Sequence, residues 1–371
     1  MMNAFRAGLD QFLGRGSASV TVPPMDGALK PNSLLDEAAS VAQVAEPDNL
    51  AFLDGDPIFT SGNQIHRLDR QTGKTASLHQ AAGGITALAV SPAQALAVAV
   101  DGGTVTILGG VHQGRSFTQL GNQPASCVTA LAFLDEATLL LCQGSTEYPI
   151  SAWQRDLLMH GRSGSVWRLD LATGQATRLI GNLAYPNGIL VQPDKQGPGK
   201  QGIVISESWQ QRLIRLQPQG GKADQLIDDL PGYPARLSLS GRGGAWLSVF
   251  APRSQLIEFV LREHTYRLAM MAEVAPEYWI APALRSNVSF KEPMQGGALK
   301  QMGILKPWAP TRSYGLVIEL NGSFEAIRSM HSRAAGHRHG ITTAVESDGA
   351  LWLTSKGGDD VLKIDLSARG A

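Results

Sequence analysis

Two histidines separated by a single residue are the side chains of this sequence best suited to proton transfer near neutral pH. His337 and His339 lie in the run Gly-His-Arg-His-Gly-Ile-Thr-Thr, just before Thr342, where a strand is expected to begin. An imidazole at such a point could act as a general base. A His-x-His pair in a loop is also a frequent surface feature, and a metal site would need a third ligand that no nearby residue supplies.

Short alternating strands separated by turns must position these side chains. Residues 164–183 alternate in polarity, turn at Ala-Thr-Gly-Gln and return as a second strand, and similar hairpins continue to the end of the chain. The 41 glycines and 20 prolines suit a molecule built from many turns. Along the whole chain, six comparable segments are predicted to be inner strands. They start near Asp48, Gly84, Val128, Asn187, Arg236 and Thr342. The pattern predicts an all-β protein, a six-bladed β-propeller.

The last predicted blade has only three strands before the chain ends, so an N-terminal strand is expected to complete it. Residues 17–23, with the sequence SASVTVP, are the candidate. We expect residues 1–45 to form an N-terminal helix and this closing strand, and residues 46–371 to form the propeller. No apolar run is long enough to span a membrane, and no signal-peptide core is evident, which predicts a cytoplasmic protein.

A long insertion at about 255–312 interrupts the strand pattern with a helix-like run from about Leu256 to Val274. It could be a lid over the channel, a helical hairpin packed on the rim, or an oligomer contact. Its large apolar residues are Met270, Met271, Trp279, Met294, Met302 and Trp308.

Three motifs in the second half of the chain resemble the strictosidine synthase-like family, within the gluconolactonase/arylesterase superfamily of six-bladed propellers. They are Tyr185-Pro186-Asn187-Gly188, Ser206-Glu207-Ser208 and Pro231-Gly232-Tyr233-Pro234-Ala235-Arg236. The resemblance covers about the last 210 residues and implies the fold. It implies no single chemistry, because the wider group includes Pictet–Spengler condensing enzymes, arylesterases and calcium-dependent lactonases.

The residues that start the inner strands should converge into a ring at one end of the channel. In the calcium-dependent lactonases this ring supplies a glutamate, asparagines and an Asp-Asn pair, a set of oxygen ligands that suits calcium. The matching positions here hold Asp48, Thr129, Asn187 and Ala235-Arg236. We therefore expect Arg236 to replace the metal charge and to hydrogen-bond Asp48 and Asn187. In the alternative, Arg236 turns outward and a weaker calcium site survives on Asp48 and Asn187.

The catalytic groups of the resembling enzymes do not transfer by residue. Gly83 stands where the lactonases carry a histidine base, and Thr342 stands where strictosidine synthases carry an acid/base glutamate. Glu207 could be a channel acid or a buried residue that ties neighbouring blades, and Trp209 could line the pocket. Cys127 and Cys142 flank a predicted hairpin and could be two buried thiols or a disulfide.

The chain has 32 basic and 32 acidic residues, and its sequence shows no basic stripe of the kind that binds nucleic acid. The sequence favours a propeller that binds a small organic molecule in its channel and hydrolyses an ester or lactone. The expected catalytic residues are His339, His337, Arg236 and Thr342, and the expected substrate-binding residues are Asp48, Thr129, Asn187, Glu207 and Trp209. The alternatives are a non-catalytic ligand-binding propeller and a condensing enzyme.

Overall fold

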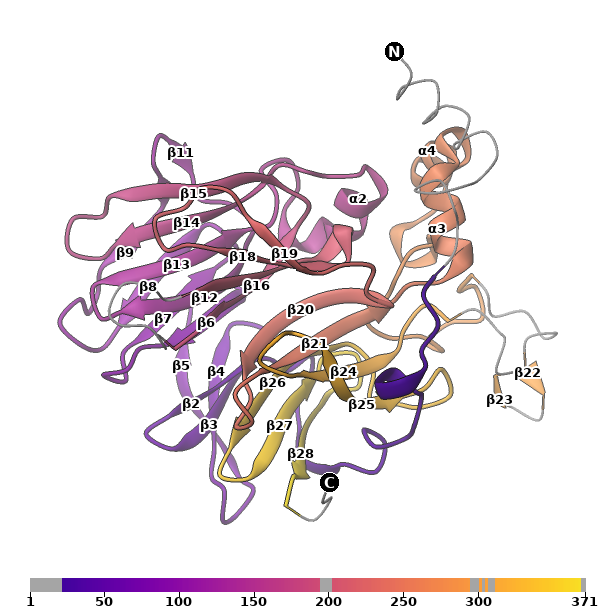
Figure 1. Cartoon of the computed structure of the whole chain (residues 1–371), viewed down its shortest axis with the longest axis horizontal. Helices are drawn as coiled ribbons and strands as arrows, with labels where there is room; N and C mark the ends of the chain where they lie inside the picture. The colour runs from indigo at the N-terminus through magenta and orange to yellow at the C-terminus, as the bar shows by residue number, and fades with distance from the viewer. Residues whose placement is uncertain (1–21, 194–201, 294–299, 302–303, 306–310, 368–371) are drawn as a thin grey trace.

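A computed structural model describes residues 22–193, 202–293, 300–301, 304–305 and 311–367. Six four-stranded antiparallel sheets are arranged around a central axis, which confirms the predicted six-bladed β-propeller (Figure 1). The first three blades are β2 (Asp48–Leu53), β3 (Asp56–Ser61), β4 (Gln64–Leu68) and β5 (Thr75–Gln80); β6 (Ile85–Val90), β7 (Leu96–Val100), β8 (Thr104–Leu108) and β9 (Ser116–Phe117); and β12 (Val128–Asp135), β13 (Thr138–Gln143), β14 (Gly164–Asp170) and β15 (Ala176–Leu183).

The last three blades follow the same order, with two departures. They are β16 (Pro186–Val191), β17 (Ile203–Glu207), β18 (Arg212–Leu216) and β19 (Asp224–Ile227); β20 (Gly232–Leu239), β21 (Ala245–Pro252), β24 (Gly315–Leu320) and β25 (Ala326–Ser332); and β26 (Ile341–Ser347), β27 (Ala350–Ser355), β28 (Asp360–Asp365) and β1 (Ala39–Gln43). The fifth blade is split by the long insertion, and the sixth takes its outer strand from the N-terminal part of the chain. Each inner strand packs beside the next, and β26 packs beside β2, so the ring is closed.

The closing strand confirms the predicted closure of the last blade but corrects the segment. β1 pairs with β28 in the register Ala39↔Lys363, and the Ser40 hydroxyl donates a hydrogen bond to Asp360 at 2.7 Å. The outer position is therefore taken by β1 and not by residues 17–23, most of which lie outside the described residues. A strand that ends at Gln43 can continue almost directly into β2 at Asp48, whereas residues 17–23 would need a long connection.

The blades pack face to face through apolar side chains that alternate along their strands. Residues of the second and third blades, such as Ala97, Val105, Leu139 and Trp167, form one buried cluster, and comparable clusters lie between other blades. The alternation that predicts strands in the sequence is thus the alternation that fills the spaces between neighbouring sheets.

The long insertion forms two helices where one was predicted. α3 (Gln255–Arg262) and α4 (His264–Glu273) are separated at Glu263, and a short helix, η5 (Pro276–Tyr278), follows. Ser254 caps α3 by accepting a hydrogen bond from the amide of Ile257 at 3.3 Å. Met294, Met302 and Trp308 of the insertion, like the predicted N-terminal helix, lie outside the residues whose side chains are described.

A second insertion, between β13 and β14, was not predicted from the sequence. It contains η3 (Ile150–Ala152) and α2 (Trp153–Leu158). Two- and three-residue elements complete the described secondary structure: η2 (Gly27–Leu29), η4 (Ser208–Gln210), β10 (Gln119–Leu120) paired with β11 (Gln123–Pro124), and β22 (Lys300–Gln301) paired with β23 (Ile304–Leu305).

Both cysteines are buried and unbonded, so the structure agrees with the apolar alternative and not with a disulfide. Burial raises the pKa of both thiols. Among the described residues, no helix combines the length and the apolar character needed to cross a lipid bilayer.

Candidate functional site

A cavity of about 350 Å³ lies where the inner strands of the propeller converge. Its walls combine the starts of inner strands with the two insertions. The lining residues are Glu46, Asp48, Ile85, Thr86, Ile150, Ser151, Trp153, Tyr185, Asn187, Ala235, Arg236, Phe250, Leu284, Thr342 and Lys356. We call this space the channel cavity.

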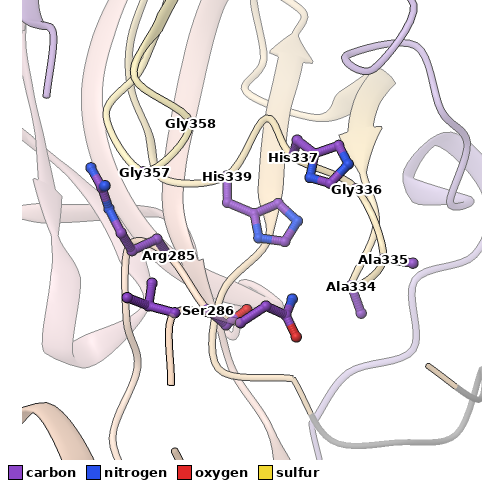
Figure 2. Close-up of a pocket in the computed structure, with 11 residues that line it drawn as sticks. Arg285, Ser286, Ala334, Ala335, Gly336, His337, His339, Gly357 and Gly358 are labelled. Atoms are coloured by element: carbon purple, nitrogen blue, oxygen red, sulfur yellow. The ribbon is translucent and has the colours of Figure 1, made fainter. Parts of the chain in front are cut away.

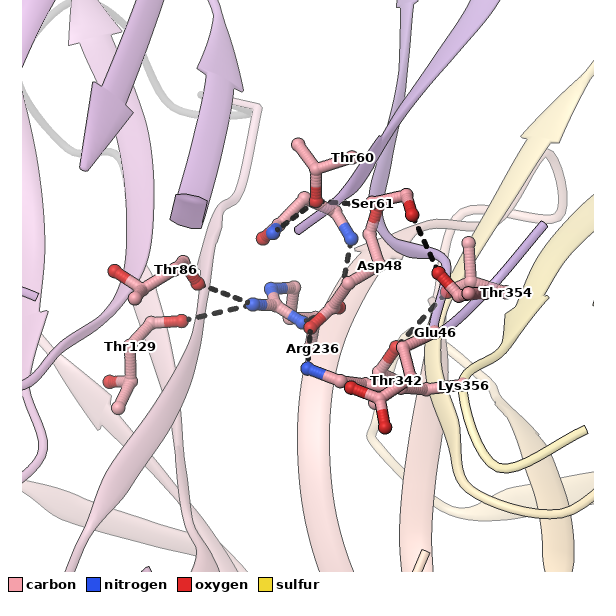
Figure 3. A network of polar contacts seen from close by, with 12 residues as sticks. Glu46, Asp48, Thr60, Ser61, Thr86, Thr129, Arg236, Thr342, Thr354 and Lys356 are labelled. Carbon is pink, nitrogen blue, oxygen red and sulfur yellow. Dashed lines mark hydrogen bonds and ion pairs between the residues drawn. The ribbon is translucent and has the colours of Figure 1, made fainter. Parts of the chain in front are cut away.

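A carboxylate held by two cations forms the polar floor of the channel cavity (Figure 3). Arg236 donates from Nη1 to Oδ1 of Asp48 at 2.6 Å, and Lys356 donates from Nζ to Oδ2 at 3.0 Å. The three side chains are 15%, 28% and 11% exposed for Arg236, Lys356 and Asp48, respectively. Two positive charges on one negative charge leave this group of residues with one excess positive charge.

The two cations control the protonation of Asp48. Burial alone would raise the pKa of this carboxyl, but the charges of Arg236 and Lys356 outweigh burial and hold the pKa well below its usual range. Asp48 therefore stays ionised at all physiological pH values and is a very weak base.

Arg236 also joins blades on the opposite side of the channel. Its Nη2 donates to the carbonyl oxygens of Thr86 and Thr129, at 3.1 and 3.2 Å. The guanidinium thus connects the fifth blade with the first, second and third blades (Figure 3). The predicted bond to Asp48 is present, whereas the remaining bonds go to these carbonyl oxygens and not to Asn187.

Local backbone geometry brings the strand starts close together. Cys127, Tyr185 and Gly340 come directly before inner strands and have positive φ angles of 44°, 58° and 62°. This left-handed conformation turns the chain sharply at the channel end. Gly188 allows a further close approach, because a Cβ atom there would lie 2.4 Å from the carbonyl oxygen of Ala235, next to Arg236.

These residues do not fit a calcium ion. Both oxygens of Asp48 accept hydrogen bonds from cationic side chains, and the carbonyl oxygens of Thr86 and Thr129 accept from Arg236. A divalent ion at this point would be repelled by Arg236 and Lys356. The described part of the chain also holds no cluster of three or more His, Cys, Asp or Glu side chains arranged for a metal.

Aromatic and aliphatic side chains form the walls above the polar floor. Trp153 comes from the insertion with α2 and contacts Phe250 edge to face, with ring centroids 5.5 Å apart. Leu284 is the lining residue from the long insertion, whose Met270, Met271 and Trp279 pack instead into a buried cluster against the propeller. The long insertion therefore contributes to one wall but serves mainly as packing.

Three predicted site residues lie at or beside the channel cavity in different ways. Asn187 and Thr342 line it. The Thr342 hydroxyl shares a hydrogen bond of 3.0 Å with that of Thr354. Thr129 is buried: its hydroxyl donates to the Pro186 carbonyl at 2.6 Å, and only its own carbonyl oxygen reaches Arg236.

Glu207 and Trp209 do not line the channel cavity. The fully buried Glu207 accepts from the amide of Ala184 at 2.7 Å and from Nε of Arg212 at 2.6 Å, which is the tying contact that the sequence left as one alternative. Trp209 lies behind the wall, stacked on Tyr185 with ring centroids 4.5 Å apart, and its indole N–H donates to Asp156 at 2.7 Å. Both residues support the site from outside it.

His337 and His339 line a different cavity, of about 500 Å³ (Figure 2). We call it the second cavity. None of its lining residues lines the channel cavity. The geometry therefore gives no support to a general base from this pair at the channel mouth.

Lys356 is the main functional candidate that sequence reasoning missed. It directly follows β27, the second strand of the last blade. Because neighbouring strands are antiparallel, the end of a second strand lies beside the start of the inner strand. A cation in this position of the Thr-Ser-Lys-Gly-Gly run could have been recognised by extending the ring to second-strand ends.

Comparisons with known proteins agree with the sequence motifs. No family model matches the chain. The adipocyte plasma membrane-associated protein of Salmo salar is 28% identical over 225 residues, which cover 58% of this chain and 47% of that protein. The strictosidine synthase-like 6 protein of Arabidopsis thaliana is 23% identical over 237 residues, or 64% of this chain and 54% of the relative. The matched regions thus span about half the length of these relatives.

Solved structures with a similar fold include gluconolactonase and regucalcin propellers. A gluconolactonase of Xanthomonas campestris has a TM-score of 0.55 at 12% identity, with 87% of each chain covered. The calcium-binding protein regucalcin of Agrobacterium tumefaciens has a TM-score of 0.50 at 12% identity, covering 88% of this chain and 93% of that one. The chain is therefore similar to strictosidine synthase-like proteins in sequence and to gluconolactonase and regucalcin propellers in fold, as predicted.

Proposed function

We propose that the channel cavity binds a small organic molecule through a carboxylate or carbonyl oxygen, and that the reaction carried out there is hydrolysis of an ester or lactone. The observation that carries this proposal is the pair of cations, Arg236 and Lys356, that lie on the single carboxylate of Asp48 at the floor, beneath largely apolar walls. The other lining carboxylate, Glu46, is more exposed and is not bonded to either cation. An oxygen with negative charge, or with growing negative charge, is the complement of such a floor.

Unused donors on the two cations support oxygen binding. An ammonium has three N–H donors, and Lys356 directs one of them at Asp48. A guanidinium has five, and Arg236 uses three in the bonds to Asp48, Thr86 and Thr129. Trp153, Tyr185 and Phe250 supply flat apolar surface for the rest of the molecule.

Hydrolysis would need a base, and Glu46 is the candidate at the cavity. Its side chain is 62% exposed, and its carboxylate lies 3.7 Å from Arg285 in a long ion pair. Asp48 is a poor candidate because both of its oxygens are engaged by cations. In this proposal Glu46 deprotonates the attacking water while Lys356 holds the carbonyl oxygen.

A non-catalytic binding protein is the second candidate function. The engagement of Asp48 favours it, because the buried carboxylate of the site is already neutralised by two cations. Binding and hydrolysis make different demands on Glu46, so the two candidates can be separated experimentally.

The test is calorimetric titration with small aromatic carboxylates and lactones, followed by a turnover assay on the phenyl esters of the acids that bind. Lys356→Met should weaken carboxylate binding about 10-fold or more, since hydrogen bonds to charged groups contribute about 1.5–3 kcal/mol. Lys363→Met is the matched control, because Lys363 is exposed and packs over Trp352 away from the cavity.

The outcomes separate the candidates. Hydrolysis is supported if the wild type turns over an ester and Glu46→Gln abolishes this turnover but still binds the acid. Binding without turnover supports the non-catalytic alternative. Binding that Lys356→Met leaves unchanged, or no binding by any compound of the panel, contradicts the proposed site.

A further inference from the structure

A chain of three polar side chains leads from the second cavity into the protein. Ser286 comes from the long insertion, Ser313 lies two residues before the start of β24, and His339 lies between β25 and β26. The Ser286 and Ser313 hydroxyl oxygens are 2.6 Å apart, and Ser313 Oγ is 2.7 Å from Nδ1 of His339. Nε2 of His339 is 2.9 Å from the carbonyl oxygen of Arg333.

The Arg333 carbonyl determines the direction of every hydrogen bond in this chain. A carbonyl oxygen only accepts, so Nε2 of His339 must carry the proton. Burial lowers the pKa of His339 and favours the neutral ring, in which Nδ1 then accepts from the Ser313 hydroxyl. Ser313 must in turn accept from Ser286, because its own hydrogen points at the imidazole.

Ser286 is thereby prepared as a nucleophile. Its hydrogen is directed inward to Ser313, and Ser286 is one of the residues that line the second cavity. Ser313 and His339 are 0% and 4% exposed, so the transfer path is buried. Figure 2 shows Ser286 and His339 at the same cavity, together with the small residues Ala334, Gly357 and Gly358.

The loop that carries Ser286 is held in place by hydrogen bonds to the side chain of Glu292. The carboxylate of Glu292 accepts hydrogen bonds from the amides of Asn287, Val288 and Ser289, at 2.9, 2.8 and 3.0 Å. His339 is fixed as well, because its carbonyl oxygen accepts from Ser355 at 2.8 Å. A nucleophile and base on restrained segments meet the requirement for preorganisation.

We propose that the second cavity is an acyl-transfer site in which Ser286 is the nucleophile, Ser313 carries its proton and His339 is the base. The substrate class is a small carboxylic ester with a short acyl group, which suits a cavity of about 500 Å³ with alanine and glycine walls. The two cavities share no lining residue, although Arg285 of the second cavity lies 3.7 Å from the Glu46 carboxylate of the channel cavity. The acyl-transfer proposal uses neither Glu46 nor Lys356, so it does not rest on the proposed channel function.

The reaction balances with water as the second substrate. Ser286 Oγ bonds to the ester carbon as its proton moves to Ser313 and the Ser313 proton moves to Nδ1 of His339. The bond to the alcohol breaks, and the alcohol takes the proton back through Ser313. Water then attacks the acyl-serine by the same route, releasing the acid. Arg285 and His337 line the cavity. The Nη atoms of Arg285 donate three hydrogen bonds to Asp359 and the Lys356 carbonyl oxygen, which leaves its Nε–H and one Nη1–H for the ester carbonyl oxygen.

The test is covalent labelling of the full chain with an alkyl fluorophosphonate, which attaches phosphorus to an activated serine and releases fluoride. Intact mass should show one label, and peptide mapping should place it on Ser286. Ser286→Ala should abolish the label, and Ser313→Ala and His339→Gln should slow it about 100-fold or more. Ser289→Ala, on the same loop but outside the proton path, should label like wild type.

Two further readouts separate this site from a structural hydrogen-bond chain and from the channel. The labelling rate should rise with pH and reach its plateau by about pH 7, because protonated His339 accepts no proton. Lys356→Met should not change it. A label on another serine, no label in wild type, or a rate that His339→Gln leaves unchanged would overturn the proposal, and mapping on wild type needs no variant to fold.

Discussion

At the scale of single residues, the channel is defined by a buried carboxylate that lies between two side-chain cations. The sequence places arginine at position 236, and the structure places its guanidinium on Asp48 and on two backbone carbonyls across the channel. Unlike a bound metal ion, an arginine side chain cannot dissociate into solvent, and its guanidinium N–H groups donate in fixed directions. Lys356 adds a second cation, whose ammonium donates to the other oxygen of Asp48 and has two further N–H donors.

The pKa of Asp48 predicts a pH-dependent cost for Asp48→Asn. The folded-state pKa lies well below the unfolded value of about 3.9, so the ionised carboxylate stabilises the protein fully above that value. This stabilisation is lost as pH falls through the folded-state pKa. We expect the variant to be about 2–4 kcal/mol less stable near pH 7, and the difference to shrink by up to about 1.4 kcal/mol per pH unit below about pH 4.

Urea unfolding of both proteins across this pH range measures the difference. Asp54→Asn is the control, because Asp54 is 63% exposed in its ion pair with Arg67 and should change stability by less than about 1 kcal/mol. A cost for Asp48→Asn that is the same at acid and neutral pH would contradict the assigned ion pairs.

At the scale of elements, the last blade joins the two ends of the propeller. Three of its strands come from the C-terminal part of the chain and the fourth from β1. The exposed edge of β28 would otherwise offer unpaired backbone groups for association with another chain. The pairing of β1 with β28 therefore stabilises the ring as a whole.

A cross-link tests this pairing. Ala39 and Lys363 are opposite each other in the register, so Ala39→Cys with Lys363→Cys should form a disulfide on mild oxidation and raise the unfolding temperature by several degrees. Ser40→Cys with Lys363→Cys is the control, because neighbouring side chains on a strand point to opposite faces.

Gel mobility before and after reduction reports the cross-link, since it closes a loop of nearly the whole chain. The native thiols of Cys127 and Cys142 are buried and do not compete. Equal cross-linking of the two pairs, or none in the matched pair, would show that β1 does not occupy this position.

At the scale of the whole molecule, six inner strands bring residues from distant parts of the chain to one axis. Asp48 and Lys356 are 308 positions apart in sequence and form one ion pair. The two insertions close over the same end, one through Trp153 and the other through Leu284. The walls and the charge of the channel cavity are thus properties of the closed ring.

The closed ring predicts that calcium does not stabilise this propeller. Thermal unfolding of the wild type should be the same with added calcium and with a chelator, because the oxygens of Asp48 and two facing carbonyls are engaged by Arg236 and Lys356. Arg236→Asn combined with Lys356→Met should make the midpoint calcium-dependent, since the two changes together free these oxygens, remove both cations and add an amide oxygen. A calcium-dependent midpoint in the wild type, measured by differential scanning calorimetry, would contradict the replacement of the metal charge.

The sequence by itself determined the architecture. Alternating polarity at short intervals and frequent turns indicate strands and their number, because the same alternation fills the spaces between blades. The family motifs around Asn187 and Arg236 identified two of the residues that line the channel cavity. These signals are local, and each can be read within a few residues.

Only the tertiary structure decided which polar residues meet. In the structure, His339 lines a second cavity and is hydrogen-bonded in a chain with Ser313 and Ser286. Glu207 does not line the channel cavity, whereas Lys356 does. The tertiary structure also selected β1 over residues 17–23 as the closing strand. The reason is physical: a contact across the ring depends on blade order, on the path of each insertion and on chain connections, none of which leaves a periodic pattern in the residues that make the contact.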